Sequence, residues 1–323
     1  MQKQFSYGDA LPPLSDNAAR QAIDATAIFQ EWRVAQRDAS RFSGGMYFKR
    51  EGDYEYLVRT RSDNRQQRLG RRDPTTEAQW AAFTQGKQQA QERLTALAQA
   101  LREAERMNKA LKVGRVPTLV VDLMNELERS GLAPYFTVVG THAMYAYEAA
   151  ASVRFQAAAL ATQDVDLLWD VRKRVQFFST MGQLDTSVLG VLQRVDPSFR
   201  RMEGQLESAI NNRGFAVDFL RRMAQADDPH PVRFSSDEDD LWPVQAKQAE
   251  QFLQAPRYEV PVVSVTGRMA LMSTVKPSIF VAFKRWLSEL ADRPPAKRRR
   301  DRLQADTVQR LLDESLLLDI ATS

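Results

Sequence analysis

The first third of the chain alternates between helical and strand-like patterns of apolar residues. Residues 17–37 carry Ala, Ile and Phe at helical spacing, which predicts a helix. Residues 46–61 instead alternate along the chain around the turn-forming sequence EGD at 51–53, so we expect a β-hairpin. Residues 62–72 are polar and basic, which predicts a loop.

A long helix is predicted next. Asp73 is suited to the N-cap and Pro74 to the first helical position. An apolar stripe that includes Leu94 and Leu101 then continues to about Leu111. We expect this stripe to pack on the protein rather than to extend as an exposed arm.

From Pro117 onward, helical and strand patterns alternate, which is typical of an α/β domain. The expected elements are a helix at 118–131, a strand at 135–139, a helix at 140–151, a strand at 162–170, a helix at 198–212 and a strand at 214–222.

The remaining chain is less regular. The acidic, polar segment at 227–240 predicts a solvated loop, 258–265 a strand, and 278–290 and 297–314 two amphipathic helices. We therefore expect three regions: an N-terminal helical region with a hairpin and a long helix (1–112), a central core (113–225) and a mostly helical C-terminal region (226–323).

The amino-acid composition excludes several classes of protein. Hydrophobic residues at 43% and charged residues at 27% are typical of a globular chain, and no apolar run approaches the ~18 residues of a membrane span. The N-terminus lacks the pattern of a secretory signal, so we expect a cytoplasmic protein. The absence of cysteine excludes disulfides and thiolate chemistry, and two histidines are too few for a His-based zinc site. The formal net charge of +4 mildly favours a polyanionic substrate.

Candidate chemistry lies in the central core. Asp164 and Asp166 are two apart in an apolar strand, so their carboxylates face the same way and repel each other unless a cation neutralises them. Asp218 interrupts another apolar strand in the same manner. Gly140 and Thr141 form a strand-to-helix turn of the kind that binds anions. Together these residues predict a site for Mg²⁺ and a phosphate-containing substrate.

These motifs carry a family resemblance. The segments VVGT (138–141), DVDLLW (164–169) and AVDF (216–219) resemble the signature of the nucleotidyltransferase superfamily of the DNA polymerase β type. The longer run VVGTHAMYAYEAAASVRF, followed by LATQDVDLLWD, is similar to a bacterial family of largely uncharacterised nucleotidyltransferase-fold proteins, related to toxin-like members of abortive-infection systems. The C-terminal helices resemble that family as well, so the likeness extends over about residues 40–310.

The resemblance implies an α/β fold with a mixed-sheet nucleotidyltransferase core, flanked by an N-terminal α/β region and a C-terminal helical region. It implies transfer of a nucleoside monophosphate from a nucleoside triphosphate to an acceptor hydroxyl on RNA or tRNA, a protein or a small molecule, with Mg²⁺ or Mn²⁺. Asp164 and Asp166 would bind both metal ions, Asp218 would complete one site, and Gly140 and Thr141 would contact phosphate. Thr141 departs from the Ser or Gly that is usual in the superfamily, and the interval before Asp164 is longer than in compact members.

Each basic residue near these motifs has two possible roles. Lys284 either reaches the triphosphate or extends along an amphipathic helix toward solvent. Lys297 and Arg300, in the run AKRRRD, either contact phosphate or RNA or form a solvated charged face. His142 and Arg154 are candidates for phosphate contacts, although a structural role is the simpler interpretation of both.

Two further hypotheses stay open at this point. The same fold can serve as a non-catalytic module that binds nucleotides or nucleic acid, although such a module has no need of a buried acidic cluster. Alternatively, the stripe of the helix at 74–111 can drive self-association of a structural protein. The sequence does not specify the acceptor, the preferred nucleotide or the oligomeric state.

Overall fold

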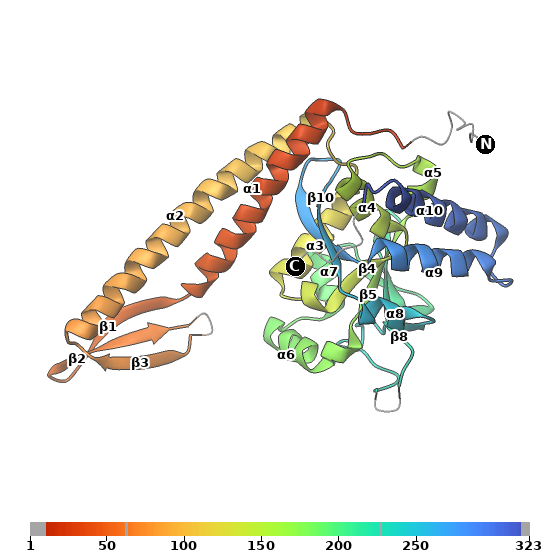
Figure 1. Ribbon diagram of the computed structural model, residues 1–323. Coiled ribbons are helices and arrows are strands. Elements are labelled where there is room, and N and C mark those ends of the chain that lie inside the picture. The colour runs from red at the N-terminus through yellow and green to blue at the C-terminus, as the bar shows by residue number, and fades with distance from the viewer. Residues whose placement is uncertain (1–10, 62–63, 226–227, 318–323) are drawn as a thin grey trace. The chain divides into compact units, whose positions relative to one another are not determined.

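The computed structural model describes residues 11–61, 64–225 and 228–317 (Figure 1). The chain forms two compact units, one of residues 20–111 and one of residues 112–323 together with 1–19.

The unit of residues 20–111 combines two long helices with a small sheet. Its elements are α1 (Asp16–Arg41, which begins in the other unit), β1 (Gly45–Glu51), β2 (Tyr54–Thr60), β3 (Gln66–Arg71) and α2 (Pro74–Ala110). The three strands are antiparallel in the order β1-β2-β3, and the expected hairpin is present as β1 and β2.

The predicted helix at 74–111 is confirmed as α2. Asp73 caps it by accepting a hydrogen bond from the Thr76 backbone N–H at 2.7 Å. The stripe of α2 packs against α1 within this unit, because α1 lies beside it (Figure 1) and the Gln21 side chain donates to Asn108 Oδ1 at 3.1 Å. Leu101 is 8% exposed as a result.

The predicted loop at 62–72 is wrong, because residues 66–71 form β3. This edge strand is exposed along most of its length, so it lacks the apolar alternation by which a half-buried strand is recognised. Pairing with β2 supplies its backbone hydrogen bonds instead.

The other unit is built on an eight-stranded mixed sheet in the order β10-β11-β4-β5-β8-β7-β6, with β9 paired to β8. Its strands are β4 (Phe136–Val139), β5 (Asp164–Trp169), β6 (Arg200–Met202), β7 (Gln205–Ile210), β8 (Ala216–Arg222), β9 (Val244–Ala246), β10 (Tyr258–Val263) and β11 (Met269–Thr274). Its α-helices are α3 (Thr118–Arg129), α4 (Ala143–Ala151), α5 (Ala157–Leu160), α6 (Arg174–Leu184), α7 (Val188–Val195), α8 (Ala249–Gln254), α9 (Pro277–Glu289) and α10 (Pro295–Asp313). Short 3₁₀ turns are η1 (Ala133–Tyr135), η2 (Gly140–His142) and η3 (Val171–Lys173).

The predicted helix at 198–212 is wrong. These residues form β6 and β7, joined by a tight turn in which Gly204 has a φ of +76°. The local sequence has no strong bias against a helix, but pairing of β7 with the buried strand β8 determines its conformation. The predicted strands at 135–139, 162–170, 214–222 and 258–265 are confirmed as β4, β5, β8 and β10.

The sheet separates two apolar cores. Val165, Leu167 and Phe219 point into the core that includes residues of α3, α6 and α7. Leu168 and Leu220 point the other way, toward α4, α8, α9 and α10. Because side chains alternate along a strand, residues 164, 166 and 218 share this second face with Leu168 and Leu220. In the described part of the chain, no helix is long and apolar enough to cross a membrane.

Candidate active site

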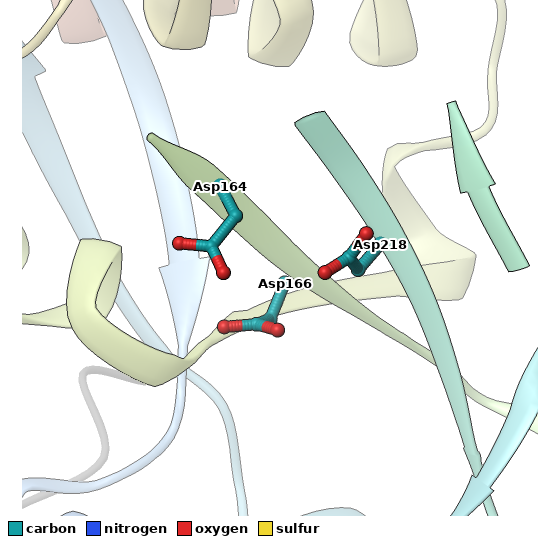
Figure 2. A group of neighbouring side chains, drawn as sticks. All are labelled: Asp164, Asp166 and Asp218. Atoms are coloured by element: carbon teal, nitrogen blue, oxygen red, sulfur yellow. The ribbon is translucent and has the colours of Figure 1, made fainter. Parts of the chain in front are cut away.

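Three carboxylates meet on the second face of the sheet. Strands β5 and β8 are parallel neighbours, and their register places Asp166 directly opposite Asp218. Asp164 is two residues earlier on β5 and therefore faces the same way. One oxygen of each of the three side chains lies within 4.8 Å of the others, and Figure 2 shows the three carboxylates turned toward one another. The structure thus brings these sequence-predicted side chains to one point.

Hydroxyl groups orient two of the carboxylates. Ser208 on β7 donates a hydrogen bond to Asp218 Oδ1 at 2.6 Å, and the Thr162 hydroxyl donates to Asp164 Oδ1. Neither residue was singled out from the sequence. Ser208 faces Asp218 in the β7–β8 register, so recognition of β7 as a strand would have revealed it. Neutral hydroxyls position the carboxylates but leave their negative charge uncompensated.

Two aspartates of the cluster, Asp166 and Asp218, have raised pKa values. Burial, followed by repulsion from Asp164 and Asp218, raises the pKa of Asp166 to about 7, against the opposing effect of Lys284 and Arg300. Burial also raises the pKa of Asp218, partly offset by the hydrogen bond from Ser208. A cluster of oxygen ligands that holds a proton near neutral pH fits a hard divalent cation, because the cation replaces the proton and removes the repulsion.

We expect Asp166→Asn to stabilise the protein at pH 8 in the presence of EDTA. The pKa of Asp166 is higher in the folded protein than in the unfolded chain, so the folded state loses stability as the pH rises from about 4 to about 7. Asn removes this loss, so its gain should be on the order of a few kcal/mol at pH 8 and clearly smaller at pH 5, where only part of the loss has occurred. Urea unfolding at both pH values measures the difference.

The matched control for this prediction is Glu207→Gln, which removes a nearby carboxylate outside the cluster and should show a much smaller dependence on pH, because Glu207 acts on the cluster only through the pKa of Asp218. An equal effect of Asp166→Asn at pH 5 and pH 8 would contradict the assigned cause.

Gly140 lies where the chain passes the carboxylates. Its φ of +66° is in the left-handed region, and a Cβ at this position would overlap Asp166 Oδ2. Glycine therefore satisfies both a backbone and a packing requirement. Thr141 follows in η2, is buried, and accepts a hydrogen bond from the Gln304 side chain at 3.1 Å.

A cavity of about 270 Å³ opens beside this turn, lined by Gly140, Thr141, Asp164 and Asp166. One part of its wall is basic and comprises Lys284, Arg293, Lys297 and Arg300. Another part is apolar and includes Leu168, Leu220, Phe252, Phe283 and Leu287. Carboxylates, cations and an apolar wall thus surround one space.

The position of Lys284 agrees in full with neither expected role, contact with the triphosphate or extension toward solvent. It does not extend to solvent, since it is 3% exposed, and its Nζ lies 3.0 Å from Asp301 Oδ1 while Arg293 pairs with the other oxygen. Burial lowers the pKa of Lys284, opposed by Asp301 and Asp166. Asp301, which is fully buried, was not singled out from the sequence. Of the other basic candidates, Arg300 also donates to the Ala161 carbonyl at 3.0 Å.

His142 and Arg154 do not line this cavity. His142 is 1% exposed and packs against the rings of Tyr145 and Phe215, and burial lowers its pKa to about 4. It is therefore neutral at physiological pH and unsuited to bind phosphate as a cation. Arg154 pairs with Glu148 at 3.2 Å and donates to the Val113 carbonyl at 2.8 Å, which is a structural role.

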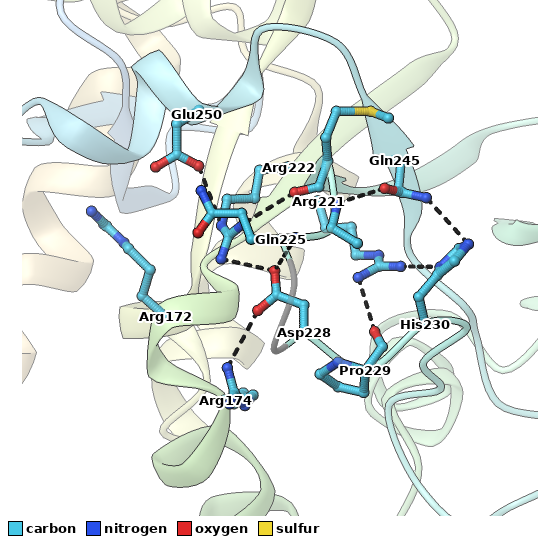
Figure 3. Close-up of polar contacts among 12 residues, drawn as sticks. Arg172, Arg174, Arg221, Arg222, Gln225, Asp228, Pro229, His230, Gln245 and Glu250 are labelled. Carbon is cyan, nitrogen blue, oxygen red and sulfur yellow. Dashed lines mark hydrogen bonds and ion pairs between the residues drawn. The ribbon is translucent and has the colours of Figure 1, made fainter.

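An ion-pair network holds α8, whose residues Ala249 and Phe252 line the cavity, against β8. At the end of β8, Arg222 lies 2.8 Å from Asp228 and 3.2 Å from Glu250 of α8 (Figure 3). Arg222 is buried, so these contacts are partly shielded from water. The same strand therefore supplies Asp218 and anchors a helix that lines the cavity.

The chain was also compared with known proteins. A family model described as nucleotidyltransferase matches residues 118–323, almost two thirds of the chain. No curated protein and no solved structure matches the chain. The matched residues begin at α3 and include the three aspartates, the turn at Gly140 and all the basic residues of the cavity.

Proposed function

Because the chain belongs to the nucleotidyltransferase family, we propose that it transfers a nucleoside monophosphate from a nucleoside triphosphate to an acceptor hydroxyl, with Mg²⁺ or Mn²⁺. The observation that carries this proposal is the convergence of Asp164, Asp166 and Asp218 beside Gly140, in a cavity with a basic wall. We also assign the mixed sheet to the polymerase β type, on the order and placement of these motifs.

The carboxylates would hold the metal, with Asp164 and Asp166 shared between two ions and Asp218 completing one site. Bound divalent cations would neutralise the cluster and stabilise the charge on the transferred phosphoryl group and on the pyrophosphate that leaves. Asp218, whose pKa is raised by burial, is suited to accept the proton of the acceptor hydroxyl. The acceptor oxygen then bonds to the α-phosphorus as the bond to pyrophosphate breaks.

The remaining residues would position the nucleotide. Lys284 and Arg300 present positive charge to the triphosphate from α9 and α10, and Gly140 allows the backbone to approach it. Phe252 and Phe283, whose ring centroids are 4.7 Å apart, offer an apolar surface to the base.

The proposal is tested by supplying nucleoside triphosphates labelled at the α- or γ-phosphate, with Mg²⁺ and separate RNA, protein and metabolite fractions of a cell extract. We expect α-label to enter one acceptor fraction and γ-label to appear only in released pyrophosphate. Binding of nucleotide by calorimetry without transfer would favour the non-catalytic module, and absence of both would reject the site. The acceptor fraction also distinguishes RNA, which the proposed relationship to toxin-like enzymes favours, from a protein or small-molecule acceptor.

A further inference from the structure

The small sheet of the other unit, with its flanking residues, carries an excess of positive charge. Residues 45–72 contain eight basic and four acidic residues, so their formal net charge of +4 equals that of the whole chain. The basic residues are Lys49, Arg50, Arg59, Arg61, Arg65, Arg68, Arg71 and Arg72. The rest of the chain is therefore formally neutral, and an excess of cations on one small element is typical of a polyanion-binding surface.

The two faces of this sheet differ in their contacts. Phe48 and its strand partner Leu57 point toward α2, since the Phe48 ring packs on Trp80 with centroids 6.2 Å apart. Tyr47, Tyr54 and Tyr56 alternate with these residues and therefore point to the opposite, outer face. Tyr47 is 39% exposed and Tyr54 is 44% exposed, so large aromatic side chains lie open to solvent there.

Arginines of β3 lie over these tyrosines. The guanidinium carbon of Arg68 is 3.1 Å from the ring centroid of Tyr56, and that of Arg71 is 3.5 Å from the ring centroid of Tyr54. Both arginines are exposed. Arg68 has an acidic neighbour, Glu51, at 3.5 Å, whereas Arg71 has no carboxylate partner among the residues that the structure describes. The outer face thus presents two Arg–Tyr contacts, and of the two arginines only Arg68 has an acidic neighbour among the described residues.

We propose that this outer face, defined by Tyr47, Tyr54, Tyr56, Arg68 and Arg71, binds single-stranded RNA. Arginine supplies positive charge for phosphates and a planar surface on which an unpaired base stacks, and exposed tyrosine extends that surface. An acidic protein partner would be attracted by the charge but would make no use of the aromatic stacks. Paired bases are closed to such stacking, which selects a single strand over a duplex.

The surface belongs to a different unit from the carboxylate cluster, and its binding of RNA does not depend on the proposed transfer reaction. The test therefore uses the full chain in EDTA without nucleotide, where transfer cannot contribute. Fluorescence anisotropy follows a 5′-fluorescein-labelled 20-nucleotide RNA of mixed sequence over a range of salt concentrations.

The charge variant is Arg68→Ala/Arg71→Ala, and its matched control is Arg102→Ala/Arg106→Ala, which removes two exposed arginines from α2 of the same unit. Loss of two phosphate contacts should lower the slope of log affinity against log salt by about 1.4 for the first variant only. Equal changes in both variants would overturn the proposal, because binding would then follow net charge rather than this face.

The stacking variant is Tyr54→Ala, with Tyr54→Phe as its conservative counterpart. Tyr54→Ala should weaken RNA binding at least about fivefold, and Tyr54→Phe should retain it. Competition by unlabelled single-stranded RNA, duplex RNA, single-stranded DNA and polyglutamate identifies the ligand class. Unchanged binding by Tyr54→Ala, or competition by polyglutamate or duplex equal to that of single-stranded RNA, would also overturn the assignment.

Discussion

Replacement of Asp164 or Asp166 by alanine is expected to lower the rate of nucleotide transfer by about 1,000-fold or more. Each substitution removes a ligand from a cluster whose three oxygens lie within 4.8 Å of one another. Stabilisation of transition-state charge by bound metal accounts for several kcal/mol, and each 1.36 kcal/mol is tenfold in rate. Incorporation of α-label into the acceptor fraction measures the loss.

The fold should survive these substitutions, because they relieve repulsion between partly buried carboxylates. Glu207→Ala is the matched control: Glu207 is near enough to raise the pKa of Asp218 but is not part of the cluster, so its loss should leave transfer largely intact. Transfer that persists in both Asp164→Ala and Asp166→Ala would reject the assignment of the site.

Asp301→Ala is expected to destabilise the protein by about 3–5 kcal/mol. The carboxylate is fully buried and pairs with both Lys284 and Arg293, and its removal takes away the ion-pair partner of the buried Lys284. Because whole domains are stable by only about 5–15 kcal/mol, the change should be evident in urea unfolding as a large shift of the midpoint.

The double variant Lys284→Met/Asp301→Leu separates stability from function. Apolar side chains in place of a buried ion pair are often neutral or stabilising, and Arg293, at 24% exposure of its side chain, is able to turn toward water. We therefore expect the double variant to regain most of the stability and still to bind nucleoside triphosphate weakly in calorimetry. Full nucleotide affinity in this variant would remove Lys284 from the proposed phosphate contacts.

The strands that carry the aspartates were predictable because each is an apolar run interrupted by a carboxylate. Val165 and Leu167 fill one core while Asp164 and Asp166 face the other way. Apolar core residues therefore alternate with the carboxylates along β5, and this alternation is visible in the sequence. The convergence of Asp218 with them required that β5 and β8 be neighbours, which they are although β6 and β7 lie between them along the chain.

Other features depend on partners that are distant in sequence. Strand β7 consists of residues that also suit a helix, and only its pairing with β8 brings Ser208 to Asp218. Strand β3 is polar on both sides, so the hydrophobic pattern does not reveal it. Asp301 falls in a basic run that is typical of a solvated surface, and its burial follows from the packing of α10 against α9. In each case tertiary structure overrides the local signal.

The opposition of Asp166 and Asp218 across two parallel strands also constrains how the sheet can assemble. A slip of one residue in β8 would turn Asp218 to the other face and place it where Phe219 packs against Phe136 and Phe234. A charged group beside these two aromatic rings is costly, so a mispaired sheet would be unstable as well as inactive. The carboxylate proposed for catalysis thereby penalises incorrect strand pairing while the chain folds.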